Sequence, residues 1–192
     1  MKMYFTRRES IILSAIDIID ELGINELSLR EIGNRQGISD SALYKHFKNK
    51  EELLLAVLDY YSRFDASIMM TIEESNMKAK AAILFFVKSI TEVYENQPSI
   101  ISITHSFEIL NTQNPTENKA KEIFLTRMDF LNKLVSNGQA DGSISLDIGS
   151  EDLADVILGY MRTLLLKWRI LKYNFPLKNR IFNGVEAILN KY

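Results

Sequence analysis

The stretch that decides the fold runs from Leu27 to Leu53 and reads LSLREIGNRQGISDSALYKHFKNKEEL. Within it, Ser28 stands three residues before Glu31, which is the spacing of a capping box that satisfies the free amides at a helix start. Gly37 can adopt the left-handed conformation that ends a helix at little cost. The sequence therefore predicts a helix from about Ser28 to Gln36.

A further helix follows after a turn of only about three residues. Ser39 can act as its N-cap, and Ile38 and Leu43 have the spacing of a hydrophobic staple. Two helices joined by so short a turn must cross steeply. Leu43 and Phe47 are the apolar anchors of this helix, so one side packs and the other is free to contact a surface.

A small basic patch follows, in a chain whose net charge is −2. Its side chains can donate hydrogen bonds to phosphate oxygens while the helix lies across a DNA groove. The placement of these residues, and not the net charge, favours DNA binding, and we expect only a modest dependence of binding on salt. The patch comprises Tyr44, Lys45, His46, Lys48 and Lys50.

The whole pattern resembles the signature of TetR-family transcriptional regulators, over roughly the first quarter of the chain. The resemblance is specific because residue types match at many fixed spacings. It implies an all-α protein of about nine helices, with an N-terminal three-helix DNA-binding domain and a C-terminal helical bundle for effector binding and dimerisation. The matching positions are Ile32, Gly37-Ile38-Ser39, Leu43-Tyr44, His46-Phe47 and Lys50-Glu51.

Two residues depart from that signature, because Gly33 and Gln36 stand where the family usually has alanine. Gly33 should cost its helix about 1 kcal/mol relative to alanine, and Gln36 places an amide near the turn. Tolerated variation and a loosened helix-turn-helix are both compatible with these residues. A plain helical hairpin whose lysines form a solvated face is the alternative without DNA binding.

The expected DNA contacts fall into two groups. Ala42 can touch a thymine methyl group and Asp40 can accept from cytosine, so we predict direct base contacts from Asp40, Ser41, Ala42 and Lys45. Phosphate contacts are predicted for Arg7, Arg8, Ser28, Tyr44, His46, Lys48 and Lys50. For the two arginines this role is implied by the resemblance, and two solvated side chains are the equal alternative.

Composition limits the other classes of protein. The chain has 192 residues, of which 46% are hydrophobic, and this suits one or two globular domains. The absence of cysteine is compatible with a reducing cytoplasm, and the first residues lack the apolar core of a signal peptide. The most apolar long stretch, Leu153 to Leu171, is interrupted by charges too often to span a bilayer. We therefore expect a cytoplasmic protein without a membrane anchor.

Apolar residues recur with helical spacing nearly throughout, and no stretch alternates as a strand would, so the fold class is predicted to be all-α. Thr6 and Glu9 form a second capping box at the start of a first helix that Gly23 ends. Asn49 can cap a long fourth helix. The later helices are predicted over roughly 77–96, 98–110, 117–137, 151–173 and 177–191.

We expect a DNA-binding domain over residues 1–52 and an effector-binding and dimerisation domain over residues 53–192. The second domain is variable in the family and commonly holds a pocket for a small effector. It has more aromatic and methionine side chains than a bundle needs, although core packing is the default role of any one of them. A subset is predicted to line an elongated apolar pocket: Phe86, Phe107, Phe124, Met128, Tyr160 and Trp168.

The last two helices resemble the pair that forms a four-helix bundle across the family's two-fold axis, which implies a homodimer. The apolar face of the first of them is broader than one neighbour requires, and Gly159 would permit close backbone approach. Burial within one chain is the alternative. The predicted interface residues are Val156, Tyr160, Leu164, Ile181, Val185 and Ile188. A symmetric dimer would bind a palindromic operator with half-sites about one DNA turn, roughly 34 Å, apart.

Other chemistry has little support in the sequence. His105 and Glu108 have a spacing that can place two ligands on one metal, but no second pair accompanies them. Asp141 and Asp147 lack the later acid of a calcium loop. Without a nucleophile and base or a phosphate loop, we expect no enzyme, no metal and no cofactor. The prediction is a repressor released from its operator by a small apolar effector; a DNA-bound interaction protein without an effector is the alternative.

Overall fold

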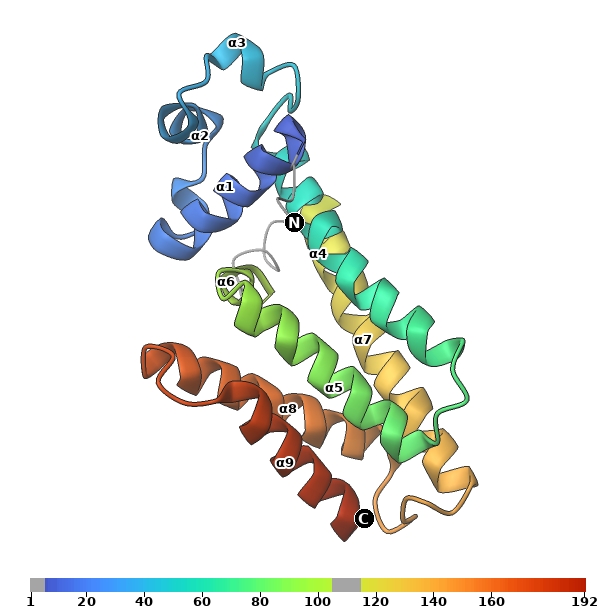
Figure 1. Cartoon of the computed structure of the whole chain (residues 1–192). Helices are drawn as coiled ribbons and strands as arrows, with labels where there is room; N and C mark the ends of the chain where they lie inside the picture. The colour runs from blue at the N-terminus through green and yellow to red at the C-terminus, as the bar shows by residue number, and fades with distance from the viewer. Residues whose placement is uncertain (1–5, 105–114) are drawn as a thin grey trace. The chain divides into compact units, whose positions relative to one another are not determined.

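A computed structural model of the chain describes residues 6–104 and 115–192. Its regular structure consists of α1 (Arg7–Leu22), η1 (Ile24–Glu26), α2 (Leu29–Gln36), α3 (Asp40–Leu43), α4 (Lys50–Glu73), α5 (Ala79–Asn96), α6 (Ile100–Thr104), α7 (Pro115–Ala140), α8 (Ser150–Ile170) and α9 (Leu177–Lys191) (Figure 1). These nine α-helices and one short 3₁₀ helix, with no strand in the described ranges, confirm the predicted all-α fold.

The chain forms two compact units. Unit 1 comprises Met1–Arg63 and Gln97–Ile123, and unit 2 comprises Phe64–Asn96 and Phe124–Tyr192. Helices α4 and α7 each contribute residues to both units. This division describes compactness alone, and the domain boundary expected after residue 52 stays a prediction.

Helices α1 and α4 begin, and α1 ends, where the local sequence signals predict. The Thr6 hydroxyl accepts from the Glu9 amide at 3.2 Å and the Glu9 carboxylate accepts from the Thr6 amide at 2.9 Å, which completes the capping box of α1. Gly23 ends α1 with a φ of 91°. Asn49 caps α4 through a 2.8 Å hydrogen bond from the Glu52 amide. These predictions are confirmed.

Aliphatic and aromatic side chains fill the core of unit 1, where α1 packs against α2 and α6, and α2 packs against α3. The most deeply buried of them are Ile11, Ile18, Leu27, Ile32, Leu43, Phe47, Leu53 and Ile100. Each contributes about 1.5–3 kcal/mol by leaving water. This burial holds α3 in place, since a single helical turn is not stable by itself.

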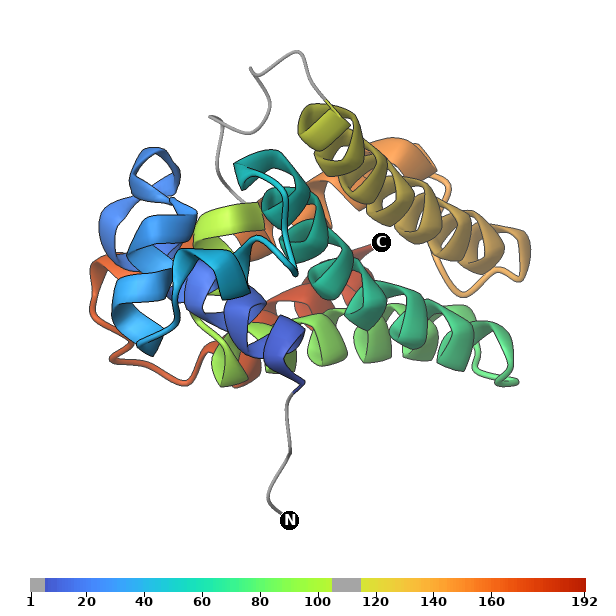
Figure 2. The ribbon, with the colours of Figure 1, turned by 90° about the horizontal axis from the view of Figure 1, so that it is seen from above.

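In unit 2, α9 lies alongside both α5 and α8 (Figure 1 and Figure 2). The rings of Phe86 on α5 and Phe130 on α7 pack with their centroids 5.4 Å apart. The core side chains that α5, α8 and α9 supply include Ile83, Val87, Ile90, Leu153, Ile157, Leu165, Leu177 and Leu189. Apolar burial therefore accounts for the arrangement of these helices.

The third helix is shorter than its pattern suggested. Ser39 is the N-cap residue of α3, but its hydroxyl pairs with the Ser41 hydroxyl at 3.2 Å instead of capping the helix. After Leu43 the chain tightens, and the His46 amide donates to the Leu43 carbonyl at 2.8 Å. Such an i to i+3 bond is typical of a 3₁₀ turn, and it ends the regular helix one turn after it begins.

Two later helices also depart from expectation. Helix α7 continues to Ala140, past the predicted end at Asn137. Gly138 lies within this helix, and its bare Cα leaves room for the buried Ile144 side chain, whose Cδ1 would lie 2.5 Å from an added Cβ. The helix predicted over 98–110 is described only as far as Thr104, and its remainder lies outside the described residues.

Candidate nucleic-acid interface

The turn between α2 and α3 is tightly packed. Gly37 takes the left-handed conformation, with φ 63° and ψ 36°, and the Ile38 amide donates to the Gly33 carbonyl at 3.0 Å. A Cβ added at Gly33 would lie 2.9 Å from the Ile38 carbonyl oxygen and 3.1 Å from Leu43 Cδ1. Glycine at this position therefore lets α2 approach the turn and α3 closely, which favours a compact helix-turn-helix over a loosened one.

Gly33→Ala is expected to lower the free energy of unfolding by about 1 kcal/mol, although alanine is the better helix former. The new methyl group would press against a backbone oxygen, which cannot rotate away. Asn34→Ala is the matched control, because Asn34 is exposed on the same helix and should lose no stability. Urea unfolding measures both variants; a Gly33→Ala protein more stable than the wild type would show that the turn accommodates a methyl group.

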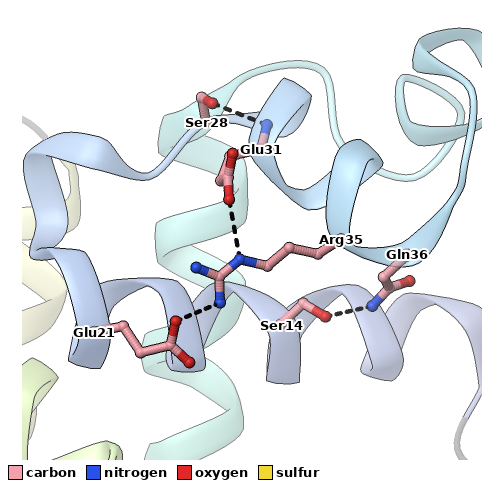
Figure 3. Close-up of polar contacts among 6 residues, drawn as sticks. All are labelled: Ser14, Glu21, Ser28, Glu31, Arg35 and Gln36. Carbon is pink, nitrogen blue, oxygen red and sulfur yellow. Dashed lines mark hydrogen bonds and ion pairs between the residues drawn. The ribbon is translucent and has the colours of Figure 1, made fainter.

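Gln36, the second departure from the signature, links α2 to α1. Its Nε2 lies 2.7 Å from the Ser10 carbonyl oxygen and 2.5 Å from the Ser14 hydroxyl. An alanine could make neither hydrogen bond. Gln36 thus fixes the end of α2 on α1, as Figure 3 shows for the Ser14 contact.

Arg35 makes a parallel link between the same two helices (Figure 3). Its Nη1 lies 2.8 Å from Glu21 on α1, and its Nε donates to Glu31 at 3.0 Å. The bonds to Glu31 and then to Glu21 raise the pKa of Arg35. Since the Glu31 carboxylate faces Arg35, only the serine half of the box predicted at α2 is seen in the described structure, with the Ser28 hydroxyl accepting from the Glu31 amide at 3.1 Å.

The four predicted base-contacting residues lie on α3 and the turn after it. Asp40, Ser41 and Lys45 are exposed, and Ala42 is half-buried. Leu43 and Phe47, the predicted anchors, are fully buried. The structure thus exposes the polar side of this segment while its apolar side packs into unit 1. The base contacts themselves stay a prediction.

The predicted phosphate contacts divide by their surroundings. Arg7, Tyr44 and Lys48 are exposed, and His46 is half-buried. Ser28 is exposed, but its hydroxyl caps α2.

Arg8 and Lys50 both have partners within unit 1, although Arg8 is exposed and Lys50 is half-buried. The Arg8 guanidinium carbon lies 4.6 Å from the centroid of the Phe47 ring, a cation-π arrangement. Lys50 donates to the Asn25 carbonyl at 3.1 Å, and partial burial lowers its pKa. Lys48, which is exposed, is therefore better placed than Lys50 to meet a phosphate.

The predicted pocket residues have several different environments. Phe86 and Trp168 are buried, and the Trp168 indole N–H donates to the Phe175 carbonyl at 3.0 Å. Met128 is half-buried. Phe124 is 52% exposed, and its predicted contact with an effector stays a prediction.

Two predicted pocket residues remain. Tyr160 is half-buried, and its hydroxyl donates to the Arg180 carbonyl at 3.3 Å. Phe107 lies outside the described residues, as do His105 and Glu108.

Unit 2 contains a cavity that the sequence did not indicate. It has a volume of about 400 Å³ and lies among the end of α4, the start of α5 and the second half of α7. Apolar side chains, most of them buried, line it together with an equal number of polar or charged ones, among them Glu73, Lys78, Lys133 and Asp141. The apolar walls include Ile72, Ala79, Ala82, Phe130 and Leu134. None of the five predicted pocket residues that the structure describes lines it.

The predicted dimer residues are partly used within the chain. Leu164, Ile181 and Val185 are buried in the core of unit 2, because α8 packs on α9 and α9 on α5 through these positions. This corrects their assignment to a surface. Val156 is 44% exposed, and Tyr160 and Ile188 are half-buried.

A second line of residues on α8 stays exposed. We call it the α8 stripe, and it comprises Val156, Gly159, Thr163, Leu166 and Ile170. Its members alternate spacings of three and four residues, the pattern of a helix-helix seam. An added Cβ at Gly159 would meet nothing within 4 Å, so another helix could approach closely there.

The described residues show neither a metal site nor a membrane span. Within them, no group of three or more histidine, cysteine, aspartate or glutamate residues is arranged to hold a metal ion. No helix among them is long and apolar enough to cross a membrane.

Comparisons with known proteins place these features in context. The family model for "Bacterial regulatory proteins, tetR family" matches residues 11–57. The chain is 22% identical over 183 residues to the HTH-type transcriptional repressor DhaR of Mycobacterium sp. (strain GP1), covering 95% of this chain and 92% of that protein.

Two solved structures share the fold over almost their whole length. The TetR transcriptional regulator from Legionella pneumophila is 22% identical and superposes with a TM-score of 0.76 over 100% of this chain and 98% of that one. The transcriptional regulator FadR from Bacillus subtilis, in complex with stearoyl-CoA, is 20% identical, with a TM-score of 0.80 over 95% and 97% of the two chains.

Proposed function

Because this chain is a DNA-binding transcriptional regulator of the TetR family, we propose that it is a dimeric repressor, released from a palindromic operator by a small effector. The observation that carries the proposal is the exposed polar side of α3, held by the buried anchors Leu43 and Phe47. Members of this family regulate transcription and are not enzymes. The protein would act in the cytoplasm, where bacterial DNA lies.

The reading surface would consist of Asp40, Ser41, Ala42 and Lys45 in the major groove. The hydrogen bonds of Arg35 and Gln36 to α1 support this proposal, because they hold α2 rigidly behind α3. A rigid support is what base recognition needs, since a base contact is lost when its geometry shifts by a fraction of an ångström.

The experiment that tests the proposal is selection of preferred sites from a random duplex DNA pool by the purified protein, followed by sequencing of the enriched fraction. We expect an imperfect palindrome whose half-sites are about 10 base pairs, or a related spacing, apart. A fraction with no enriched sequence at moderate salt would contradict operator binding.

Lys45→Ala and Lys48→Ala are expected to affect DNA binding in different ways. Loss of a base contact at Lys45 should change which sequences are selected. The free energy of discrimination between bases should fall by about 1–3 kcal/mol at the one position that Lys45 contacts. Loss of a phosphate contact at Lys48 should weaken binding to all sequences alike. The slope of the logarithm of the binding constant against the logarithm of the salt concentration should fall in magnitude by about 1. Lys50→Ala is the control, and we expect a smaller effect because its ammonium group is bound to the Asn25 carbonyl. If Lys45→Ala and Lys48→Ala both lost affinity uniformly for all sequences, the division into base and phosphate contacts would be contradicted.

We assign the dimer contact to the α8 stripe, which replaces the buried positions Leu164, Ile181 and Val185. The exposure of Leu166 and Ile170, at 59% and 68%, supports this assignment, because a partner helix would remove this apolar surface from water.

The effector would be apolar or amphipathic and would bind in unit 2. Support comes from the mixed lining of the 400 Å³ cavity, in which apolar side chains stand beside charged ones, and from the similar FadR structure, which contains stearoyl-CoA. Phe86, Met128 and Trp168 remain candidates for contact with the ligand.

Two hydrogen bonds in unit 1 would pass the effect of effector binding on to the DNA-binding helices α2 and α3. Ser99 donates to Asp17 at 3.3 Å and Ser102 to Asp20 at 2.5 Å, which joins α6 and the residue before it to α1. Burial raises the pKa of Asp17, and the Ser99 hydrogen bond opposes that shift. A displacement of α6 would therefore act directly on the helix that supports α2 and α3.

A further inference from the structure

Three polar side chains form a cluster in the core of unit 2. Arg127 on α7 donates from Nε to Asp65 Oδ2 at 2.5 Å and from Nη2 to Asp65 Oδ1 at 2.8 Å. Its Nη1 donates to the Tyr94 hydroxyl at 2.9 Å. Asp65 belongs to α4 and Tyr94 to α5, so this group, which we call the Asp65 cluster, joins three helices of unit 2.

The Asp65 cluster is mostly buried: Asp65 and Tyr94 are buried, and Arg127 is half-buried. The Arg127 and Asp65 side chains are 14% and 8% exposed, whereas those of the ion pair between Lys133 and Glu73 are 59% and 55% exposed. Moving charges out of water costs free energy that their mutual attraction roughly offsets, so a buried pair adds little stability over well-packed apolar side chains. Stability therefore does not explain why an ion pair lies at these buried positions.

The geometry of the pair supplies such a reason. A guanidinium fork that meets both oxygens of one carboxylate fixes the distance and the angle between two helices, whereas apolar side chains can repack when a helix shifts. Helix α4 is unbroken from Lys50 to Glu73. It carries Leu53 and Tyr61, which are buried in unit 1, as well as Asp65 in unit 2. A shift of α4 at Asp65 is therefore carried along the helix to the unit that reads DNA.

We propose that Asp65 and Arg127 are positioning residues for operator binding, because they fix α4 in one register. They thereby hold the two reading units of a dimer, which are its two copies of unit 1, at one separation. This inference rests on the proposed function of an operator-binding dimer. A single half-site engages one reading unit, so its affinity does not depend on that separation. A palindrome engages two, and its dissociation constant rises as the fraction of correctly spaced dimers falls.

The test compares the wild type with the double variant Asp65→Val/Arg127→Met, which removes both charges and leaves neither unpaired. The probes are the palindrome selected from the random pool and a duplex holding one of its half-sites. We expect an unfolding midpoint in urea near that of the wild type, an unchanged half-site affinity and a loss of about tenfold in palindrome affinity. An unchanged ratio of the two affinities in the folded double variant would overturn the proposal.

Arg127→Lys is a second variant, which keeps the charge but loses the fork. If the pair only neutralised charge, lysine at position 127 would preserve the palindrome affinity. A positioning role predicts instead that lysine leaves the palindrome affinity reduced. Restoration of the full wild-type affinity ratio by lysine would count against the proposal.

Amide hydrogen exchange gives a readout that needs no DNA. We expect residues 64–73 to exchange faster in the double variant and residues 50–61 to exchange at the wild-type rate. If each of the two segments exchanged at the same rate in the double variant as in the wild type, the positioning role would be overturned. This holds even if the wild type selected no DNA. A wild type that selects no DNA would refute the proposed function, and the exchange result would stand separately from it.

Discussion

Arg127→Met alone is expected to lower the free energy of unfolding by about 3–5 kcal/mol. The substitution leaves the Asp65 carboxylate buried without the two guanidinium hydrogen bonds that it accepts in the wild type. The cost is that of an unpaired buried charge, which exceeds the net contribution of the intact pair. Urea unfolding measures the loss, and an unchanged slope against urea concentration would show that the same surface is exposed on unfolding.

Two further variants separate burial from simple loss of charge. Asp65→Val added to Arg127→Met should restore most of the lost stability, because no unpaired charge remains. Lys133→Met, which breaks the exposed pair with Glu73, should cost less than about 1 kcal/mol. Equal losses for Arg127→Met and Lys133→Met would mean that water reaches Asp65 and that the argument from burial is wrong.

The Asp65 cluster also shows where prediction from the sequence ends. Asp65 and Arg127 are 62 positions apart, and Arg127 and Tyr94 are 33 apart, so no local spacing links them. One signal was available: Asp65 falls four residues after Tyr61 on α4, in phase with a face that is otherwise buried. A charged residue on a buried face indicates a partner, but the sequence does not say which basic residue supplies it.

The reading unit was more predictable because its signals are local. Capping boxes, cap residues and helix-ending glycines act within one turn, and they correctly placed the starts of α1, α2 and α4 and the ends of α1 and α2. The role of Gly33 was not predictable in the same way. Its propensity cost is a local property, whereas the close approach of the Ile38 carbonyl that requires glycine is a tertiary contact.

The dimer surface illustrates a different difficulty. The sequence shows that α8 is apolar over a broad face, but helical periodicity does not tell which part of that face meets the chain's own helices. The structure divides it: Leu164 turns into the core of unit 2, and Leu166, two residues later and on the other side, is exposed. The distinction depends on where α9 packs, which is information from the tertiary structure.

Leu166→Asp is therefore expected to abolish dimerisation and to weaken palindrome binding by about 10²–10⁴-fold. A charge within the α8 stripe would have to be buried without a partner if the two copies associated. A dimer that loses its interface also loses the high effective concentration with which the second reading unit finds its half-site. Sedimentation of the protein and titration of the palindromic duplex measure the two effects.

Leu146→Asp is the matched control, because Leu146 is 80% exposed and lies between α7 and α8, outside the α8 stripe. It should leave both the dimer and the palindrome affinity unchanged. Half-site affinity should be the same in both variants, since α3 and its anchors are untouched. A Leu166→Asp protein that remains a dimer would place the interface elsewhere on the chain, whereas a monomer with full palindrome affinity would mean that the two reading units bind independently.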